Sequence, residues 1–467
     1  MVQNLVHSQD TIVALATAQG LGALGIIRLS GKDSFSICQS VFKGKNLAEQ
    51  ASHTLQYGYI YDGETLIDEV VLSLFKAPKS FTTEDIIEIS CHGSPFIIQK
   101  TIDLLIKKGA RLAAAGEFTM RAFFNGRIDL AQAEAVADLI ASESKASHAI
   151  ALNQMRGGIS SELADLREAL VNFTALIELE LDFGEEDVEF ADRNDLLLTL
   201  HTLDANVQKL MVTFEYGNAI KNGVPVAIVG KPNAGKSSLL NTLLNENRAI
   251  VSSIAGTTRD TIEEVLNIDG IQFRFIDTAG LRKTNDEIEK IGISKAIEKI
   301  EQASVVIYLF DKNDTSIKEI KNDLKEISED KIVFICPSKI DLYPDFDWNN
   351  WIADINNNFT HPITILGISS LAKDKSIDTL KNGLVESIKG NVSANDVIVS
   401  NARHFESLKN AKLAIAEVQL ALKNNVSGDQ ISPHLKDVLH HIGNITGAID
   451  VDKDILGTIF GKFCIGK

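Results

Sequence analysis

The sequence predicts an α/β protein with an added helical domain, which is interrupted by an inserted P-loop domain with a mostly parallel sheet. First, residues 226–229 form an apolar strand pattern that runs directly into a glycine-rich loop. Second, helical patterns flank this segment on both sides. Third, the N-terminal part alternates short strand and helix patterns, which is typical of an α/β domain.

The chain is therefore expected to contain four segments. Residues 1–124 form an N-terminal domain, residues 125–220 the first part of the helical domain, residues 221–385 the P-loop domain, and residues 386–467 the second part of the helical domain. Insertion of one domain into another is tolerated where the ends of the insert lie close together.

Short apolar runs predict the strands of the N-terminal domain. The expected strands are residues 11–16, 24–29, 69–75 and 86–90, and an amphipathic helix is expected over 96–107. This domain shows no catalytic constellation, and His92 is interpreted as structural in preference to catalytic.

The helical domain is predicted from apolar residues that recur at three- and four-residue steps. A long helical stretch is expected over residues 129–182, broken at Gly157-Gly158, and a second over 402–422. The acidic run at 178–189 is interpreted as a solvated bend between helices. The apolar stripe of the first stretch consists of Leu163, Leu166, Leu170, Phe173, Ile177 and Leu181.

The glycine-rich loop matches the P-loop pattern in full, as Gly230-x4-Gly235-Lys236-Ser237. Glycines let backbone N–H groups close around phosphate oxygens, and the following helix points its positive end at them. Lys236 is expected to reach the β- and γ-phosphates, and the Ser237 hydroxyl to ligate Mg²⁺. The expected nucleotide contacts in the loop are Asn233, Ala234, Gly235, Lys236, Ser237 and Ser238.

Downstream segments follow in the order expected of a Ras-like GTPase domain. Residues 265–269 and 271–276 predict a hairpin, whose second strand leads to Asp277, Thr278, Ala279 and Gly280. The Asp277 carboxylate is placed to hold Mg²⁺ through water, and Thr258 to complete the Mg²⁺ shell. Further strands are expected over 304–310, 331–336 and 363–368.

A guanine-recognition segment is predicted at residues 338–341, formed by Ser338, Lys339, Ile340 and Asp341. It resembles the Asn-Lys-x-Asp element of GTPases, in which the Asp carboxylate accepts two hydrogen bonds that adenine cannot donate. Ser369 and Ser370 fit the last nucleotide-binding element of that fold. Ser338 replaces the usual Asn, so GTP specificity is expected to persist with weaker affinity.

The hydrolysis machinery is unusual, because Leu281 stands where many GTPases carry a water-orienting Gln. The Asn233 carbonyl oxygen can hold a monovalent cation, such as K⁺, near the β/γ bridge, and Glu289 can reach a bridging water. Both residues also have ordinary interpretations. Asn is common in turns, and a Glu on a polar helix is usually solvated.

Composition fits a globular protein outside the membrane, with 45% hydrophobic and 23% charged residues. We expect no signal peptide, no membrane span and a cytoplasmic location; the scattered Cys38, Cys91, Cys336 and Cys464 suit a reducing compartment. The net charge of −17 means that RNA contact needs a local basic patch or a partner protein.

Several segments together resemble the tRNA-modification GTPase family (MnmE, also called TrmE). They are residues 10–14 (DTIVA), 25–31 (GIIRLSG), 88–93 (EISCHG), 116–130 (GEFTMRAFFNGRIDL), 132–140 (QAEAVADLI) and 463–467 (FCIGK). The resemblance covers the whole chain. The combination of a mid-chain P-loop with the Cys-Ile-Gly-Lys ending is highly specific.

The resemblance implies an N-terminal domain that binds 5-formyl- or methylene-tetrahydrofolate as one-carbon donor and forms a homodimer. The implied folate contacts are Arg28, Glu88, Arg127 and Lys467. With a flavin-dependent partner protein, in a heterotetramer, the family modifies C5 of the wobble uridine of certain tRNAs, joining a methylene unit to glycine or ammonium.

The resemblance also implies K⁺-activated GTP hydrolysis when two GTPase domains meet. The implied K⁺ ligands are Asn233, Ser252, Ile254 and Thr257, and Glu289 matches the catalytic acid. The loop before Thr258 would line the nucleotide through Ser252, Ser253, Ile254, Ala255, Gly256 and Thr257.

Three positions depart from the family pattern, namely residues 18–22 (AQGLG), Ser94 and Asn444. They bear on the folate-site details more than on the family. Cys464 is either a nucleophile or a structural thiol. The alternatives to this function are a GTP-dependent RNA-binding switch in ribosome assembly and the soluble part of a GTP-gated membrane transporter.

Overall fold

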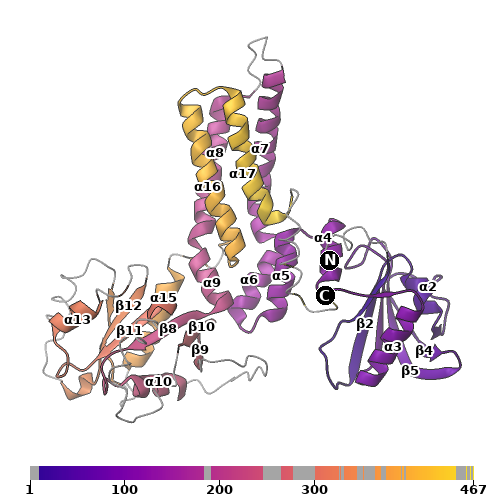
Figure 1. Ribbon diagram of the computed structural model, residues 1–467, viewed down its shortest axis with the longest axis horizontal. Coiled ribbons are helices and arrows are strands. Elements are labelled where there is room, and N and C mark those ends of the chain that lie inside the picture. Colours follow the sequence, from indigo (N-terminus) through magenta and orange to yellow (C-terminus); the bar gives the residue numbers. More distant parts are fainter. Residues whose placement is uncertain are drawn as a thin grey trace. The chain divides into compact units, whose positions relative to one another are not determined.

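The computed structural model describes residues 10–182, 191–245, 264–276, 300–324, 331–343, 363–369, 375–390 and 396–448, with single positions at 327, 351, 392, 393, 459, 463 and 466. The chain divides into two compact units. The first holds residues 1–141, 151–205 and 407–467, and the second holds residues 142–150 and 206–406. A seven-stranded sheet lies in the first unit and a six-stranded sheet in the second (Figure 1).

The seven-stranded sheet has the order β3-β4-β5-β6-β2-β1-β7. All neighbouring pairs are antiparallel except β1 with β7. The expected strands of this domain are confirmed, and β3, β4 and β7 are additions to them. The bounds are β1 Ile12–Leu15, β2 Leu24–Ser30, β3 Phe42–Lys43, β4 Thr54–Asp62, β5 Thr65–Phe75, β6 Ile86–His92 and β7 Arg111–Leu112.

Helices lie on both faces of this sheet. The expected helix is α3 (Pro95–Lys107), which places Ile98, Ile102 and Leu105 in the core with Ile27, Leu72 and Ile89 of the strands. Burying each such aliphatic side chain stabilises the domain by about 1.5–3 kcal/mol. A shorter helix on the same face, α2 (Ser34–Gln39), adds Ile37 and Cys38 to this core. The helix α4 (Glu117–Phe124) lies against the opposite face, where Phe118 packs with Ile12 and Ala14 of β1.

The helical part contains α5 (Leu130–Ala141), α6 (Lys145–Met155), α7 (Gly158–Asp182), α8 (Arg193–Val212), α9 (Phe214–Asn222), α16 (Ala402–Lys423) and α17 (Gly428–Thr446). The predicted break at Gly157-Gly158 is confirmed, and a further break follows α5. Within α7 the core positions are Leu163, Leu170 and Ile177, whereas Leu181 at its end is 42% exposed. Ile159 and Thr174 are also buried, and Leu166 and Phe173 are half-buried, so the stripe keeps the predicted three- and four-residue steps except at Leu181.

The first part of the acidic run does not form a bend. Residues 178–182 belong to α7, so the predicted bend is wrong there, and residues 183–190 lie outside the described residues. Glu178 accepts a hydrogen bond from Ser432 and forms an ion pair with Lys436 Nζ at 2.8 Å. Glu180 accepts from Arg193 Nη2 at 2.5 Å. These carboxylates connect α7 to α17 and to the start of α8.

The six-stranded sheet has the order β13-β12-β11-β8-β10-β9. Only β9 pairs in antiparallel fashion, through the predicted hairpin at Asp269-Gly270, so the expectation of a mostly parallel sheet is confirmed. The bounds are β8 Val224–Val229, β9 Glu264–Ile268, β10 Ile271–Phe275, β11 Val305–Phe310, β12 Ile332–Pro337 and β13 Ile363–Ile365.

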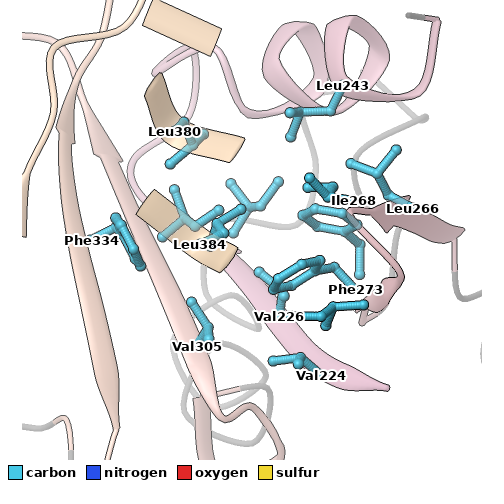
Figure 2. Close-up of a cluster of buried hydrophobic side chains, with 14 of the residues drawn as sticks. Val224, Val226, Leu243, Leu266, Ile268, Phe273, Val305, Phe334, Leu380 and Leu384 are labelled. Atoms are coloured by element: carbon cyan, nitrogen blue, oxygen red, sulfur yellow. The ribbon is translucent and has the colours of Figure 1, made fainter. Parts of the chain in front are cut away.

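Apolar clusters cover both faces of this sheet, which explains why its central strands are apolar throughout. On one face α10 (Lys236–Asn245) and α15 (Lys375–Lys389) contribute Leu243, Leu380 and Leu384, which pack with Phe273 and Phe334 (Figure 2). On the other face α13 (Ile317–Leu324) contributes Ile320 and Leu324. Among the described residues, no helix is both long and apolar enough to cross a membrane.

Candidate functional site

The P-loop lies between the end of β8 and the start of α10, as predicted. Gly230 has φ of +144°, and a Cβ atom there would lie 1.8 Å from the Leu309 carbonyl oxygen of the neighbouring strand. A side chain cannot fit at that distance. Asn233 has φ of 62°, a left-handed conformation that Asn tolerates better than most residues, and its side chain is exposed. The loop conformation therefore depends on the residue types at these two positions.

The Lys236 ammonium is hydrogen-bonded to the backbone of the P-loop. Its Nζ donates to the carbonyl oxygens of Gly230 and Lys231, both at 2.7 Å. Ser237 and Ser238 follow in the first turn of α10, where helix N–H groups lack partners within the helix. Ammonium, N–H groups and hydroxyls are thus gathered at one helix N-terminus, which is the arrangement that binds phosphate.

A second lysine ties the P-loop to the segment after β11. Lys231 Nζ donates to the Asp314 carbonyl oxygen at 2.7 Å and to Glu319 Oε1 at 2.9 Å. Hydrogen bonds from the Ser316 backbone N–H and then from Lys231 lower the pKa of Glu319 to about 2. Glu319 is therefore ionised at neutral pH and fixes the base of the loop.

The segment 338–341, predicted to recognise guanine, follows β12, beside the end of β13. Ser338 is 4% exposed, and its Oγ donates to the Phe310 carbonyl oxygen at 3.0 Å. A parallel bridge between Ser338 and Ile368 brings the fully buried Ser369 next to this segment. Lys339 has φ of 56°, and Asp341 is exposed. Two of the predicted nucleotide-binding elements are thus adjacent in the fold.

Asp311, the residue after β11, holds this segment from the side. Its Oδ2 accepts from Lys339 Nζ at 2.8 Å, and its Oδ1 accepts from the Tyr343 hydroxyl at 3.0 Å. Burial acts to raise the pKa of Asp311, but the hydrogen bonds from Lys339, the Asn313 N–H and Tyr343 outweigh it, so the pKa lies below its ordinary value. Asp311 was not predicted as a site residue from the sequence; a carboxylate directly after a buried parallel strand is the signal that was available.

Several predicted nucleotide-site residues lie outside the described residues, and their positions stay predictions. They are Ser252, Ser253, Ile254, Ala255, Gly256, Thr257, Thr258, Asp277, Thr278, Ala279, Gly280, Leu281, Glu289 and Ser370. In the part of the chain that is described, no group of His, Cys, Asp and Glu side chains has metal-binding geometry.

A second cluster of charged side chains lies in the N-terminal domain. Arg28 of β2 faces Glu88 of β6 across the sheet, with Arg28 Nη2 at 2.7 Å from Glu88 Oε1. The Arg28 guanidinium is 5.8 Å from the ring centre of Phe81, and the Arg127 guanidinium is 5.4 Å from the same ring. The structure thus brings the three described residues of the expected folate site together around Phe81. Sequence analysis did not select Phe81, although an aromatic residue within a polar loop is a usable signal.

Lys467 lies outside the described residues, but Gly466 beside it is buried. A Cβ atom on Gly466 would lie 2.0 Å from the Leu15 carbonyl oxygen, at the end of β1. Phe463 packs with Met120 and Leu130. Phe463 and Gly466 therefore lie against the N-terminal domain.

Other candidate reactive groups in this domain have structural contacts. Asp68 accepts from the His92 backbone N–H at 2.8 Å and lies 2.7 Å from His92 Nδ1. Burial raises the pKa of Cys38 to about 12 and, with the Asp68 charge, that of Cys91 to about 11. Both thiols are therefore protonated at neutral pH and poor nucleophiles. Cys464 lies outside the described residues.

Comparisons with known proteins identify the family. The model of the GTP-binding protein TrmE N-terminus matches residues 11–127, and that of the MnmE helical domain matches residues 130–464. The chain belongs to the MnmE family. The tRNA modification GTPase MnmE of Cytophaga hutchinsonii is 53% identical over 99% of both chains. The MnmE proteins of Flavobacterium johnsoniae and Bacteroides thetaiotaomicron are 51% and 49% identical, over 98% of this chain and all of theirs.

The two clusters fit the ligands that MnmE membership implies. Lys236, Ser237 and the helix N-terminus supply the donors that a nucleotide with Mg²⁺ requires. Arg28, Glu88, Arg127 and Phe81 supply cations, a carboxylate and an aromatic face, which suit a flat conjugated ring with an anionic tail.

Proposed function

We propose that this MnmE-family chain is a K⁺-activated GTP hydrolase that acts with a flavin-dependent partner protein. The pair would install a (carboxymethyl)aminomethyl group at C5 of the tRNA wobble uridine, using a one-carbon unit of 5-formyl- or methylene-tetrahydrofolate. The curated relatives carry the name tRNA modification GTPase, which supports this substrate class.

The observation that carries the proposal is the P-loop, in which Lys236 Nζ lies 2.7 Å from two loop carbonyl oxygens. Phosphate oxygens are stronger acceptors than these carbonyls for a lysine ammonium, because they are charged. Binding of GTP would therefore turn Lys236 from the loop to the β- and γ-phosphates. Asp341 is exposed, so its carboxylate is accessible to the hydrogen-bond donors of the guanine edge.

The proposed metal sites use residues from this loop and from segments beyond it. Ser237 would hold Mg²⁺ with Thr258 and with Asp277 through water. Asn233 would hold K⁺ with Ser252, Ile254 and Thr257. The cation supplies positive charge near the β/γ bridge, where charge develops during hydrolysis. Glu289 would position the attacking water, since Leu281, which directly follows Gly280, cannot.

The proposed folate contacts are Arg28, Glu88, Arg127 and Lys467, in a domain that would also form the homodimer. The outer face of the N-terminal sheet supports an interface there, because Leu55, Tyr57 and Val71 are 67%, 57% and 37% exposed. Tyr57 pairs with Val71 across β4 and β5, so their side chains lie on the same face as that of Leu55. A heterotetramer with the partner protein, together with tRNA, would complete the assembly. Within the chain, the proposed domain boundaries lie after residues 124, 220 and 385.

The GTP turnover rate in K⁺ against Na⁺ at equal ionic strength tests the hydrolysis mechanism. We expect a large K⁺ stimulation, which is lost in Asn233→Ala and in Asn233→Gly. The glycine variant keeps the left-handed backbone and removes only the amide. Asn425→Ala is the matched control, since Asn425 is also exposed with φ of 52°. Equal rates in both salts for the unmodified protein would refute K⁺ activation.

Wobble-uridine analysis of tRNA from a deletion strain tests the biological role. Loss of the modified nucleoside is the expected result. Normal tRNA modification together with accumulated ribosomal subunit precursors would instead assign the chain to ribosome assembly.

A further inference from the structure

The position of Phe81 depends on a loop that belongs to no strand or helix. This loop, residues 80–84, connects β5 to β6 and presents Phe81 to Arg28 and Arg127. No sheet ladder fixes residues 80–84. The loop is held by the Thr83 N–H to Ser80 carbonyl hydrogen bond, by packing of Phe81 against Phe118, and by polar side-chain contacts.

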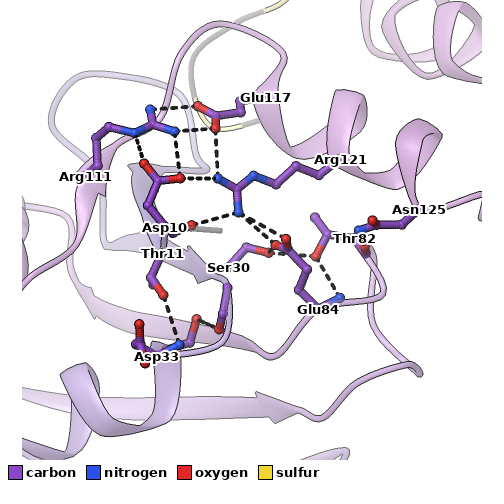
Figure 3. A network of polar contacts seen from close by, with 12 residues as sticks. Asp10, Thr11, Ser30, Asp33, Thr82, Glu84, Arg111, Glu117, Arg121 and Asn125 are labelled. Atoms are coloured by element: carbon purple, nitrogen blue, oxygen red, sulfur yellow. Dashed lines mark hydrogen bonds and ion pairs between the residues drawn. The ribbon is translucent and has the colours of Figure 1, made fainter. Parts of the chain in front are cut away.

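Three side chains from α4 and the turn after it contact every second residue of this loop. Arg121 Nη1 donates to Glu84 Oε1 at 3.1 Å, Asn125 Nδ2 donates to the Thr82 carbonyl oxygen at 2.6 Å, and Arg127 Nη1 donates to the Ser80 carbonyl oxygen. Figure 3 shows Arg121 and Asn125 directed at Glu84 and Thr82. We call Arg121 and Asn125 the α4 clamp. Phe81 lies in the chain between Ser80 and Thr82, whose carbonyl oxygens accept two of these hydrogen bonds.

The clamp is itself anchored. Arg121 is 6% exposed, and its Nη2 donates to Asp10 Oδ1 at 3.1 Å and to the buried Glu117 at 3.0 Å (Figure 3). A buried guanidinium with several charge-assisted hydrogen bonds has little freedom to move. The Glu84 end of the loop is therefore held by a rigid group.

The opposite side of the loop is held by the strand that carries Arg28. Ser30 Oγ donates to Glu84 Oε2 at 2.6 Å and lies 2.7 Å from Thr82 Oγ1. Ser30 is two residues after Arg28 on β2, so the loop and the Arg28 side chain share one support. The side chains of Arg28, Phe81 and Arg127 consequently keep fixed positions relative to one another.

We propose that Arg121 and Asn125 are positioning residues that hold Phe81 between Arg28 and Arg127, in the site assigned above to tetrahydrofolate. The identity of the ligand rests on the proposed function, whereas the clamp rests on the contacts of α4. A stacked aromatic ring and flanking cations bind a flat conjugated anion well only when their mutual geometry is set in advance. Asn125 contributes by fixing the Thr82 backbone next to Phe81, without touching the ligand.

Asn125→Asp tests the proposal in the full-length protein. The side chain is exposed, so the fold should tolerate the change, while a carboxylate in place of the amide faces the Thr82 carbonyl without a donor. We expect hydrogen exchange of residues 79–85 to rise in the ligand-free protein and binding of 5-formyltetrahydrofolate to weaken about tenfold. GTP turnover and the melting temperature should stay unchanged. Arg121→Lys should act in the same direction, but its burial makes Asn125→Asp the decisive variant.

Asn46→Asp is the matched control, because Asn46 is an exposed residue of the same domain that donates one amide hydrogen bond, to Glu49 at 2.7 Å. If hydrogen exchange and affinity in Asn125→Asp match those of the control, the clamp is refuted. Weaker binding with unchanged exchange of residues 79–85 also refutes it, since Asn125 would then act by contacting the ligand. If the unmodified protein does not bind 5-formyltetrahydrofolate, the proposed function fails, and the exchange result alone decides the clamp.

Discussion

Lys339 donates to Asp311 Oδ2 at 2.8 Å, so the predicted guanine-recognition segment is tied to the residue that follows the neighbouring strand β11. In the usual Asn-Lys-x-Asp element, the Asn amide braces this region. Here Ser338 is buried and its hydroxyl is engaged by the Phe310 carbonyl oxygen. The Asp311 carboxylate, which also accepts from the Tyr343 hydroxyl, braces this segment instead.

Asp311→Asn should weaken guanine-nucleotide binding. The neutral amide loses the charge-assisted contact to Lys339, which is worth about 1.5–3 kcal/mol for a hydrogen bond to a charged group, with the lower end expected for a partly exposed lysine. We expect about a tenfold rise in the dissociation constant of a fluorescent GDP analogue. Asp314→Asn removes the same charge from an exposed neighbour and should change the affinity much less. Equal affinities for the two variants would contradict this role of Asp311.

Glu117→Gln should destabilise the N-terminal domain in a pH-dependent way. Glu117 is fully buried and accepts from Arg111, Arg121 and the Ala114 N–H. Burial acts to raise its pKa, but the hydrogen bonds from Arg111 and the Ala114 N–H outweigh this, so the pKa lies below 4.5. The ionised side chain therefore stabilises the fold above that value, and the contribution is lost as the pH falls through the folded-state pKa.

The expected loss at neutral pH is about 3 kcal/mol, because both guanidinium groups lose their buried charged partner and keep only the more exposed carboxylates of Asp10 and Glu84. Urea unfolding of both proteins, followed by circular dichroism at several values between about pH 7 and pH 3, measures it. The difference between them should shrink as the pH falls. A difference that stays constant over this range would assign the loss to packing and not to charge.

The fold was predictable where the apolar pattern agreed with the burial, and not where it was reversed. The parallel strands of the P-loop domain are apolar on both faces, so runs such as β11 are visible without a partner. In β4 the pattern is inverted: Gln56 and Gly58 face the core, while Leu55, Tyr57 and Tyr59 are exposed. Gly58 is inside because the Phe42 ring occupies the space that a side chain would need. Local periodicity cannot supply that information.

The candidate site was predictable as far as its residues form contiguous motifs. The P-loop and residues 338–341 are local in sequence, so their spacing alone identified them. Phe81 and Asp311 gain their importance from neighbours distant in sequence, such as Arg28 and Lys339, and became visible only with the sheet register. The bend expected at 178–182 was wrong because Lys436 and Arg193, distant in sequence, neutralise the acidic side chains and let the helix continue.

Thr213→Val should destabilise the second unit, where the chain returns from the P-loop domain. Thr213 is 3% exposed, and its Oγ1 accepts from the N–H of the fully buried Val399 at 2.9 Å. Valine keeps the shape but leaves that N–H without a partner, which costs about 1–3 kcal/mol. Thermal unfolding measures the loss. Thr379→Val removes an exposed hydroxyl that donates within α15, and should change stability by less than about 0.5 kcal/mol. A similar small effect for both variants would contradict the prediction.

Gly466→Ala should weaken folate binding by displacing the segment that carries Lys467. Gly466 has φ of +100°, and a Cβ atom would lie 2.0 Å from the Leu15 carbonyl oxygen. Because that oxygen belongs to β1, the strand cannot move aside cheaply, so residues around 466 must shift instead. We expect the affinity for 5-formyltetrahydrofolate to fall by about tenfold or more, as expected for loss of one charged contact.

Gly109→Ala is the control, since Gly109 has a similar φ of +111° with no atom within 4 Å of the added Cβ. It introduces only the backbone strain of about 1–2 kcal/mol and should leave the affinity unchanged. Calorimetric titration of both variants separates the two effects. Normal affinity in Gly466→Ala would contradict the proposed contact between Lys467 and folate.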